Sequence, residues 1–237
     1  MKKSTLLLFL AFATISSFAQ EITGKQLLEK SIKYHDPEGK WETFQGTLYI
    51  TMETPNKPKR DSEIKIDIPN EYFYVKATQG NKTTEYTLDK EKCTIQFNGK
   101  TPTEKEKKDN KLSCERANLY KNYYTYLYGM PMKLNDPGTI IEEKVNLEKF
   151  MGEMYLMLRV TYKKEVGEDI WYFYFNQENY ALEAYQFYHD ESKFDGEYIV
   201  FTGMETINGV KMPKTRAWYY NKNQQYLGTD ILRNGKE

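Results

Sequence analysis

The segment Cys114–Gly138, CERANLYKNYYTYLYGMPMKLNDPG, decides how this chain folds. It is the only long segment in the middle of the chain without the alternation typical of a strand. Its apolar residues recur at spacings of three and four, which indicates a helix that buries a wide face. They fall into two sets, Leu119, Tyr123 and Tyr126 in one and Tyr120, Tyr124, Leu127 and Tyr128 in the other. The pattern predicts an aromatic helix that packs into a concave partner.

The sequence also marks both ends of this helix. Ser113 is a suitable N-cap, and Glu115 lies at the positive end of the helix dipole. Gly129 is expected to take the left-handed conformation that ends many helices, and Pro131 does not continue a helix.

Most of the remaining chain alternates apolar and polar residues with a period of two, which predicts half-buried antiparallel strands separated by short turns. The expected strands are 44–53, 63–68, 71–78, 83–88, 91–97, 139–147, 153–163, 168–176, 180–188, 196–206, 211–221 and 226–233. A sheet this long must curl to bury its apolar face. The predicted fold is mainly β with α: a single domain in which a curved antiparallel sheet, or unclosed half-barrel, of about 11–12 strands wraps around two helices.

Two capping boxes predict further helices. Thr23 and Gln26 mark the start of an N-terminal helix that stops at Asp36 and Pro37. Thr103 and Glu106 mark a small exposed helix inside a charged excursion, for which a solvated face is the expected role.

Residues 1–19 have the pattern of a secretory signal peptide. Lys2 and Lys3 precede an apolar run, and a small-x-small site ends at Ala19. The run is too short for a transmembrane helix and no second run follows, so no transmembrane segment is expected. The sequence predicts a periplasmic or secreted protein, cleaved near Ala19, whose residues 20–237 form one domain.

The net charge of the chain excludes one class of function. The chain has 34 Lys and Arg against 34 Asp and Glu, so removal of Lys2 and Lys3 leaves a net charge of about −2. Such a chain lacks the basic surface that nucleic-acid binding needs.

Cys93 and Cys114 are predicted to form a disulfide, since thiols of exported chains tend to pair. The alternative is two separately buried thiols.

The histidines are the only candidates for a metal or catalytic site. His35 and His189 are each followed by aspartate, and together these pairs have the donor types of a zinc site. Their places at the ends of predicted elements favour structural roles, with a His35 cation suited to a helix C-terminus. No nucleophile, metal or phosphate-loop motif is present. We therefore predict no catalytic residue, no metal and no cofactor. The alternative is an enzyme that uses two of the many carboxylates, among which the sequence marks no particular pair.

The strongest functional signal is apolar. Strands 154–162 and 168–175 direct large apolar residues inward, where the central helix covers them. Such a surface either packs the helix fully or leaves an apolar cavity. The predicted cavity lining is Tyr124, Leu127, Met130, Leu156, Leu158, Val160, Trp171, Phe173 and Phe175.

Three segments resemble an uncharacterised family of secreted bacterial proteins: KSIKYHDPEGKWETFQGTL, YYTYLYGMPMKLNDPG and KFDGEYIVFTGMETINGVKMP. The order of elements also resembles the lipoprotein carriers LolA and LolB, unclosed barrels that hold acyl chains under a helical lid. In those carriers an arginine that follows a proline turn helps to close the lid. The comparable stretch here, Ile68–Tyr74, has none.

The resemblance therefore implies a general apolar-ligand protein rather than a dedicated lipoprotein carrier. The predicted ligand is a lipid acyl chain or lipoprotein, bound without catalysis, and any protein partner is unknown. Two alternatives stay open: a glycan-binding or scaffolding module that uses exposed tyrosines, and a hydrolase with an unrecognised site.

Overall fold

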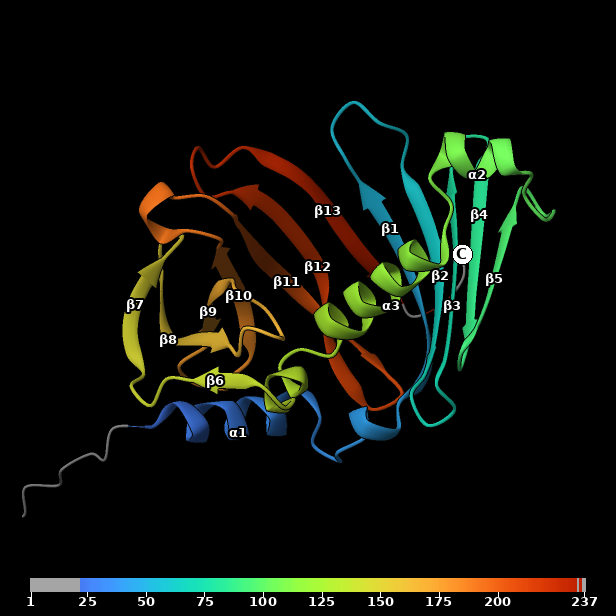
Figure 1. Ribbon diagram of the computed structural model, residues 1–237. Helices are drawn as coiled ribbons and strands as arrows, with labels where there is room; N and C mark the ends of the chain where they lie inside the picture. Colours follow the sequence, from blue (N-terminus) through green and yellow to red (C-terminus); the bar gives the residue numbers. More distant parts are fainter. Residues whose placement is uncertain (1–21, 234, 236–237) are drawn as a thin grey trace, which may run out of the picture.

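A curved antiparallel sheet forms the frame of the protein, and helix α3 (Cys114–Tyr128) lies across its concave face (Figure 1). The computed structural model describes residues 22–233 and residue 235, and within them the sheet contains 13 strands. It is not closed into a barrel. The predicted fold class is confirmed. The predicted signal peptide, 1–19, lies outside the described residues.

The first and last strands pair in the middle of the sheet, where Ile50 lies opposite Leu232. From this pair the chain runs outward in two meanders, so the order is β5-β4-β3-β2-β1-β13-β12-β11-β10-β9-β8-β6, with β7 also paired to β8. The strands are β1 (Gln45–Glu53), β2 (Arg60–Asp67), β3 (Tyr72–Gln79), β4 (Lys82–Asp89), β5 (Lys92–Phe97), β6 (Thr139–Ile141), β7 (Asn146–Phe150), β8 (Glu153–Tyr162), β9 (Ile170–Phe175), β10 (Leu182–Tyr188), β11 (Glu197–Ile207), β12 (Val210–Tyr220) and β13 (Tyr226–Arg233).

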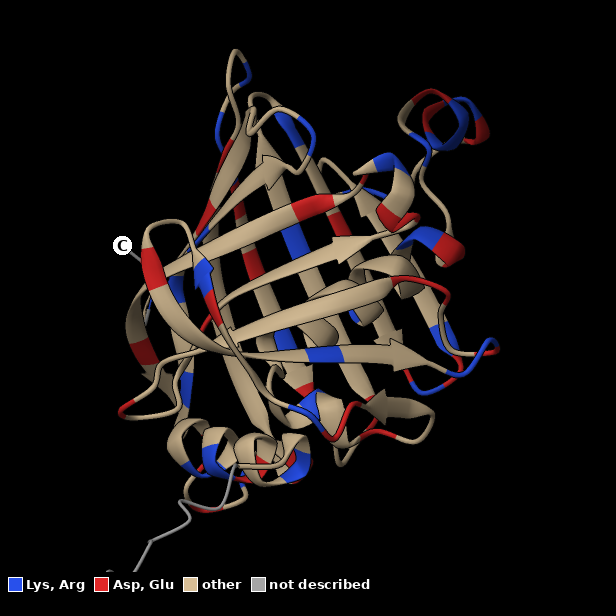
Figure 2. Ribbon diagram, turned by 90° about the vertical axis from the view of Figure 1, so that its left-hand side faces the viewer, with Lys and Arg blue, Asp and Glu red and all other residues tan. Residues whose placement is uncertain are grey.

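Two further helices lie at the rims of the sheet. Helix α1 (Gly24–His35) covers one open end, and α2 (Glu104–Asn110) lies beyond the opposite end of α3 (Figure 1). Both start with the predicted capping boxes, at Thr23 and Thr103. Helix α2 has no buried residue, and Figure 2 shows its basic and acidic residues side by side at the upper right. Short 3₁₀ turns complete the structure at Trp41–Thr43, Met132–Asn135 and Glu191–Lys193.

The single strand predicted at 139–147 is wrong, because two strands form there. Strands β6 and β7 pair with different parts of the same neighbour, β8. The Glu142 N–H still donates to the Arg159 carbonyl of β8, but the next residue meets the start of α1, where the Gly24 N–H donates to the Glu143 carbonyl at 2.8 Å. Thr23 also forms an isolated bridge with Lys144. This contact between distant segments interrupts an otherwise continuous strand pattern.

The predicted left-handed conformation of Gly129 is also wrong. Its φ is −88°, so any residue could adopt its backbone. Glycine is needed because a Cβ here would lie 2.2 Å from Cζ2 of Trp41. The C-terminus of α3 therefore ends against a tryptophan ring, and the constraint is close approach rather than backbone freedom.

The core lies between α3 and the concave face of the sheet. Tyr124, Leu127 and Tyr128 from the helix are buried together with Phe73 and Phe173 from strands on opposite sides. Each side chain of this size contributes about 1.5–3 kcal/mol when fully buried. The aromatic helix is thus the element on which both halves of the sheet pack.

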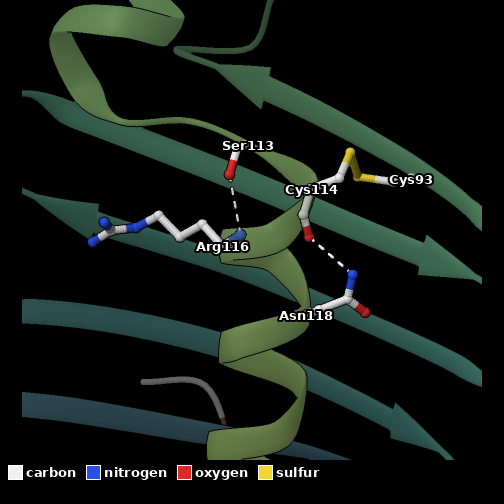
Figure 3. Close-up of a disulfide and its surroundings, with 5 residues drawn as sticks. All are labelled: Cys93, Ser113, Cys114, Arg116 and Asn118. Carbon is white, nitrogen blue, oxygen red and sulfur yellow. Dashed lines mark hydrogen bonds between the residues drawn. A yellow bond between two sulfur atoms is a disulfide. The ribbon is translucent and has the colours of Figure 1, made fainter.

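A disulfide fixes the start of α3. Cys114, the first residue of the helix, is bonded to Cys93 of the edge strand β5, and their Cα atoms are 6.0 Å apart (Figure 3). The Ser113 hydroxyl accepts from the Arg116 N–H at 3.2 Å, as the predicted N-cap requires (Figure 3). The predicted disulfide is confirmed, and it fits an extracytoplasmic protein.

Candidate functional site

An open pocket of about 370 Å³ lies between the N-terminal half of α3 and strands β1 and β2. Met52 and Arg60 form its floor. They are register partners on neighbouring strands, so both side chains project from the same face of the sheet. The helix supplies residues at i, i+3, i+4 and i+7, which share one face. These are Arg116, Leu119, Tyr120 and Tyr123.

A second pocket, of about 220 Å³, adjoins the first on the side of β3, β4 and α2. Arg60, Arg116 and Tyr120 line both pockets, so they form a common wall. We call the two pockets together the α3 groove. The second pocket is also lined by Ala77, Gln79, Lys82, Thr84, Tyr86, Phe97, Asn110 and Leu112.

Aromatic rings make the helix side of the α3 groove rigid. The Tyr120 ring lies between Tyr86 and Tyr124, at centroid distances of 5.7 and 6.2 Å. Tyr123 stacks on Trp218 at 6.2 Å. Packed rings of this kind hold their positions, so the pocket is largely formed before any ligand enters.

Leu119 is the most exposed large apolar residue of this region, at 67%. The helical periodicity places it on the buried face of α3, an expectation that is wrong, because an open pocket separates this part of the helix from strands β1 and β2. An exposed leucine over an open pocket provides apolar surface that a ligand can cover.

The two arginines of the groove have no acidic partner. Arg60 Nη2 donates to the Tyr124 hydroxyl at 3.4 Å, and its Nε is buried without a hydrogen-bond partner. Among the described residues, neither Arg60 nor Arg116 has a carboxylate oxygen within 4.0 Å. No Asp or Glu lines either pocket. The groove is therefore cationic.

The nearest buried carboxylate is that of Asp230, which lies in the same row of the sheet. Met52 is the register partner of both Arg60 and Asp230, and Asp230 is the partner of Arg216. Burial raises the pKa of Asp230, while the positive charges of Arg60 and Arg216 oppose the rise. The Tyr123 hydroxyl donates to Asp230 Oδ2 at 3.4 Å. The carboxylate of Asp230 thus interacts with Arg216 and the Tyr123 hydroxyl beneath the groove as well as with Arg60.

The residues predicted from sequence to line a cavity lie in or against the core. Tyr124, Leu127, Met130, Leu158, Val160, Phe173 and Phe175 are buried, and Leu156 and Trp171 are partly buried against them. None of the nine lines the α3 groove. Their role in ligand binding stays a prediction.

Packing explains why this half of the concave face is filled. Helix α1 lies against β8, where a Cβ on Gly24 would be 2.7 Å from the Leu158 side chain. Tyr126 packs edge-on against Trp171 at 5.8 Å and is hydrogen-bonded to Tyr162. Helix α1 therefore packs on β8, and α3 packs on β8 and β9 through Tyr126.

None of the groove residues was predicted as a site residue, and Arg60 fell between the expected strands 44–53 and 63–68. In the structure β2 begins at Arg60. The signal was present in the alternation, since Arg60 is in phase with Ser62, Ile64 and Ile66, all of which face inward. The alternation of inward and outward residues in β2 has to be extended from Ile64 toward the N-terminus before it includes Arg60. Without that extension, an arginine beside a polar loop is assigned to the loop.

The histidines occupy different environments. His35 is fully buried, and both ring nitrogens are hydrogen-bonded to the backbone, of Lys211 and Leu182. His189 is exposed and its Nδ1 lies 2.6 Å from Asp169 Oδ1, which raises its pKa. Within the described part of the chain no group of three or more His, Cys, Asp or Glu has the arrangement of a metal site. Neither ring nitrogen of His35 is free to act as a base.

The fold and the groove define a half-barrel protein, an open antiparallel sheet around a helix with a preformed pocket on its concave face. The chain belongs to a family of unknown function, DUF6503, whose model matches residues 2–234. This membership confirms the resemblance to an uncharacterised family. No curated protein matches the chain.

Three solved structures are similar in overall shape. A LolA superfamily protein from Nitrosomonas europaea has 12% identity and a TM-score of 0.49 over 90% of this chain and 92% of that one. A DUF1329 family protein from Desulfovibrio piger has 8% identity, a TM-score of 0.49 and the same coverage. An outer membrane lipoprotein-sorting protein domain from Vibrio parahaemolyticus has 10% identity and a TM-score of 0.46, covering 90% and 94%. No helix in the described residues is long and apolar enough to cross a membrane.

Proposed function

We propose that this protein is an exported, non-catalytic binding protein for a molecule with an acyl chain, and that the chain enters the pocket beneath the N-terminal half of α3. The observation that carries the proposal is the position of Leu119, exposed above an open pocket with Met52 as its floor and Tyr120 and Tyr123 as its walls. A volume of about 370 Å³ lies at the lower end of the range for small-molecule sites and suits one chain rather than several.

The energetics support a useful affinity. Burial of about sixteen carbons contributes roughly 12 kcal/mol at about 0.8 kcal/mol per methylene. Association and ordering cost about 4 kcal/mol or more. About 8 kcal/mol at most is left, which corresponds to a dissociation constant near 1 μM. Because aromatic contacts already hold the pocket open, no packed core has to separate before this ligand binds.

The residues predicted from sequence to line a cavity would contact the ligand only in a second step, after the open pocket is filled. Tyr124 and Leu127 lie further along α3 than Tyr123, Met130 follows the end of the helix, and β8 and β9 pack against this region through Tyr126. A chain too long for the open pocket would reach them only if α3 moved off the sheet, at the cost of opening a packed core.

Displacement of a fluorescent fatty-acid probe tests the location. Leu119→Asp should weaken probe binding at least tenfold, because it places a charge on the apolar rim. Leu147→Asp, at a leucine of β7 that is also largely exposed, is the matched control and should bind as the unaltered protein does. If neither variant alters binding while folded Leu158→Ala does, the ligand occupies the core region instead. If the unaltered protein binds no probe at tens of micromolar, the proposal is wrong.

The glycan or scaffold alternative has weaker support. The convex face does carry a tyrosine row, in which Phe150 stacks on Tyr174 at 4.1 Å and Tyr198 on Tyr219 at 5.0 Å. These rings stack on one another, and Tyr174 and Tyr198 are buried. Sugar-binding platforms need free ring faces, so the row is used for its own packing. The acyl-chain proposal is therefore the better supported of the two.

A further inference from the structure

We infer that the ligand of the α3 groove carries an anionic head, which Arg60 and Arg116 bind while its chain occupies the apolar pocket. This inference rests on the proposed function and specifies its ligand class. The two adjoining pockets differ in polarity. The larger contains Met52, Leu119 and Tyr123, whereas the smaller contains polar groups such as Gln79, Thr84 and Asn110. A ligand that spans the common wall is amphiphilic.

The common wall has the charge that an anion needs. Arg60 projects from β2 and Arg116 from the first turn of α3, and both line both pockets. Planar guanidinium groups bind carboxylate and phosphate oxygens in pairs, with well-defined geometry. Lys82 adds a third cation to the smaller pocket, although its Nζ already donates to Asn110 Oδ1 at 2.9 Å.

Arg60 is poorly satisfied without such a ligand. Its one protein hydrogen bond is the 3.4 Å contact with the Tyr124 hydroxyl, and its buried Nε has no partner. Asp230 opposes the charge of Arg60 only from two strands away, and it also faces Arg216 and the Tyr123 hydroxyl. A partly buried cation whose Nε lacks a partner carries a desolvation cost, and an anionic oxygen in the groove would relieve that cost.

Arg116 is held in place from two sides. Its guanidinium lies over the Tyr120 ring at 5.7 Å, and the neighbouring Cys114 fixes this turn of the helix to β5. Figure 3 shows the Arg116 side chain extending away from the disulfide. The second arginine is thus presented by a tethered turn rather than by a mobile loop.

The head can be a carboxylate, as in a fatty acid, or a phosphate monoester, as in a lysophospholipid-like molecule. Both present two or more anionic oxygens at the end of one chain, and the arginines do not distinguish them on charge alone. Titration calorimetry with dodecanoate and dodecyl phosphate separates these sources, while dodecanol and dodecyltrimethylammonium test the requirement for negative charge. All four probes have the same chain and are used below their micelle concentrations.

We expect at least one anionic probe to bind tenfold or more tightly than dodecanol, with dodecyltrimethylammonium the weakest. Arg60 and Arg116 line the apolar pocket as well, so Arg60→Gln and Arg116→Gln should each weaken anion binding about tenfold more than dodecanol binding. Lys149→Gln, an exposed residue of β7, changes the net charge equally and should have no effect. Arg116 is itself exposed, so its variant reports even if Arg60→Gln fails to fold.

The outcomes separate this inference from the proposal beneath it. Equal binding of dodecanol and the anionic probes overturns the anionic head and leaves the acyl-chain site intact. Loss of dodecanol binding in Leu119→Asp, with tight anion binding in the unaltered protein, supports both. If none of the four probes binds, the proposed function itself fails.

Discussion

The imidazole Nε2 of His35 accepts a hydrogen bond from the backbone N–H of Leu182 at 2.9 Å, across 147 positions of the chain. Its Nδ1 donates to the carbonyl of Lys211 at 2.8 Å. The ring therefore joins the end of α1 to strands β10 and β12. This geometry requires a neutral imidazole, and burial lowers its pKa to about 4. The expectation of a His35 cation at the helix C-terminus is wrong, because burial outweighs the helix dipole.

Acid should destabilise the protein through His35. Its pKa is 6.5 when unfolded and about 4 when folded, so protons bind the unfolded state more tightly. The stability that depends on the neutral ring is complete above pH 6.5 and is lost as the pH falls toward 4, by about 3 kcal/mol in total. Urea unfolding at pH 7.0, 5.5 and 4.5 measures this loss. His35→Gln should flatten the pH dependence over that range, and His189→Gln, at an exposed site, is the control. An unchanged slope in His35→Gln would contradict the assignment.

Removal of the disulfide should cost stability. The Cys93–Cys114 bond closes a loop with a sequence separation of 21. On the chain-entropy account such a loop contributes about 3 kcal/mol. The double variant Cys93→Ser, Cys114→Ser should lose about this much in urea unfolding, and reducing agent should no longer change its midpoint. A loss below about 1 kcal/mol would mean that α3 is anchored by packing alone. Probe binding by the double variant shows whether the tether also holds the groove.

Gly129→Ala should be strongly destabilising despite its ordinary backbone angles. The new methyl would lie 2.2 Å from Cζ2 of Trp41 and 2.5 Å from the carbonyl of Thr125. Overpacking of this kind typically costs about 1–3 kcal/mol. Gly167→Ala is the matched control, because its added methyl would meet no atom closer than 3.9 Å. Thermal unfolding compares them. Equal melting temperatures would show that the tryptophan moves aside without cost.

Arg216 and Asp230 should be energetically coupled. They face each other on β12 and β13, both are buried, and the Arg216 guanidinium lies 3.7 Å from the centre of the Tyr128 ring. Arg216→Leu leaves the buried Asp230 with less compensation and should cost about 3 kcal/mol or more. Adding Asp230→Leu should restore part of that loss, since two apolar residues need no partner. A double-mutant cycle in urea gives the coupling, and strict additivity would show that the two groups act independently.

The sequence alone determined the local features of this protein. The capping boxes at Thr23 and Thr103, the bounds of α3 and most strands follow from interactions within a few residues, so periodicity and turn chemistry specify them. The pairing of Cys93 and Cys114 was also predictable, because the two cysteines of an exported chain have only each other. The fold class followed from the same signals, since a long half-apolar sheet with one aromatic helix has few ways to bury its surface.

Only the tertiary structure decided where the concave face stays open. Leu158 and Phe173, which the apolar pattern placed in a cavity lining, are buried in the core, and their role in ligand binding stays a prediction. An open pocket lies beside Arg60, which looked like a loop residue. Close approach at Gly129 and burial of His35 were hidden for the same reason. Each depends on a residue more than 80 positions away, and neither propensity nor period carries information about which distant segment will fill a given space.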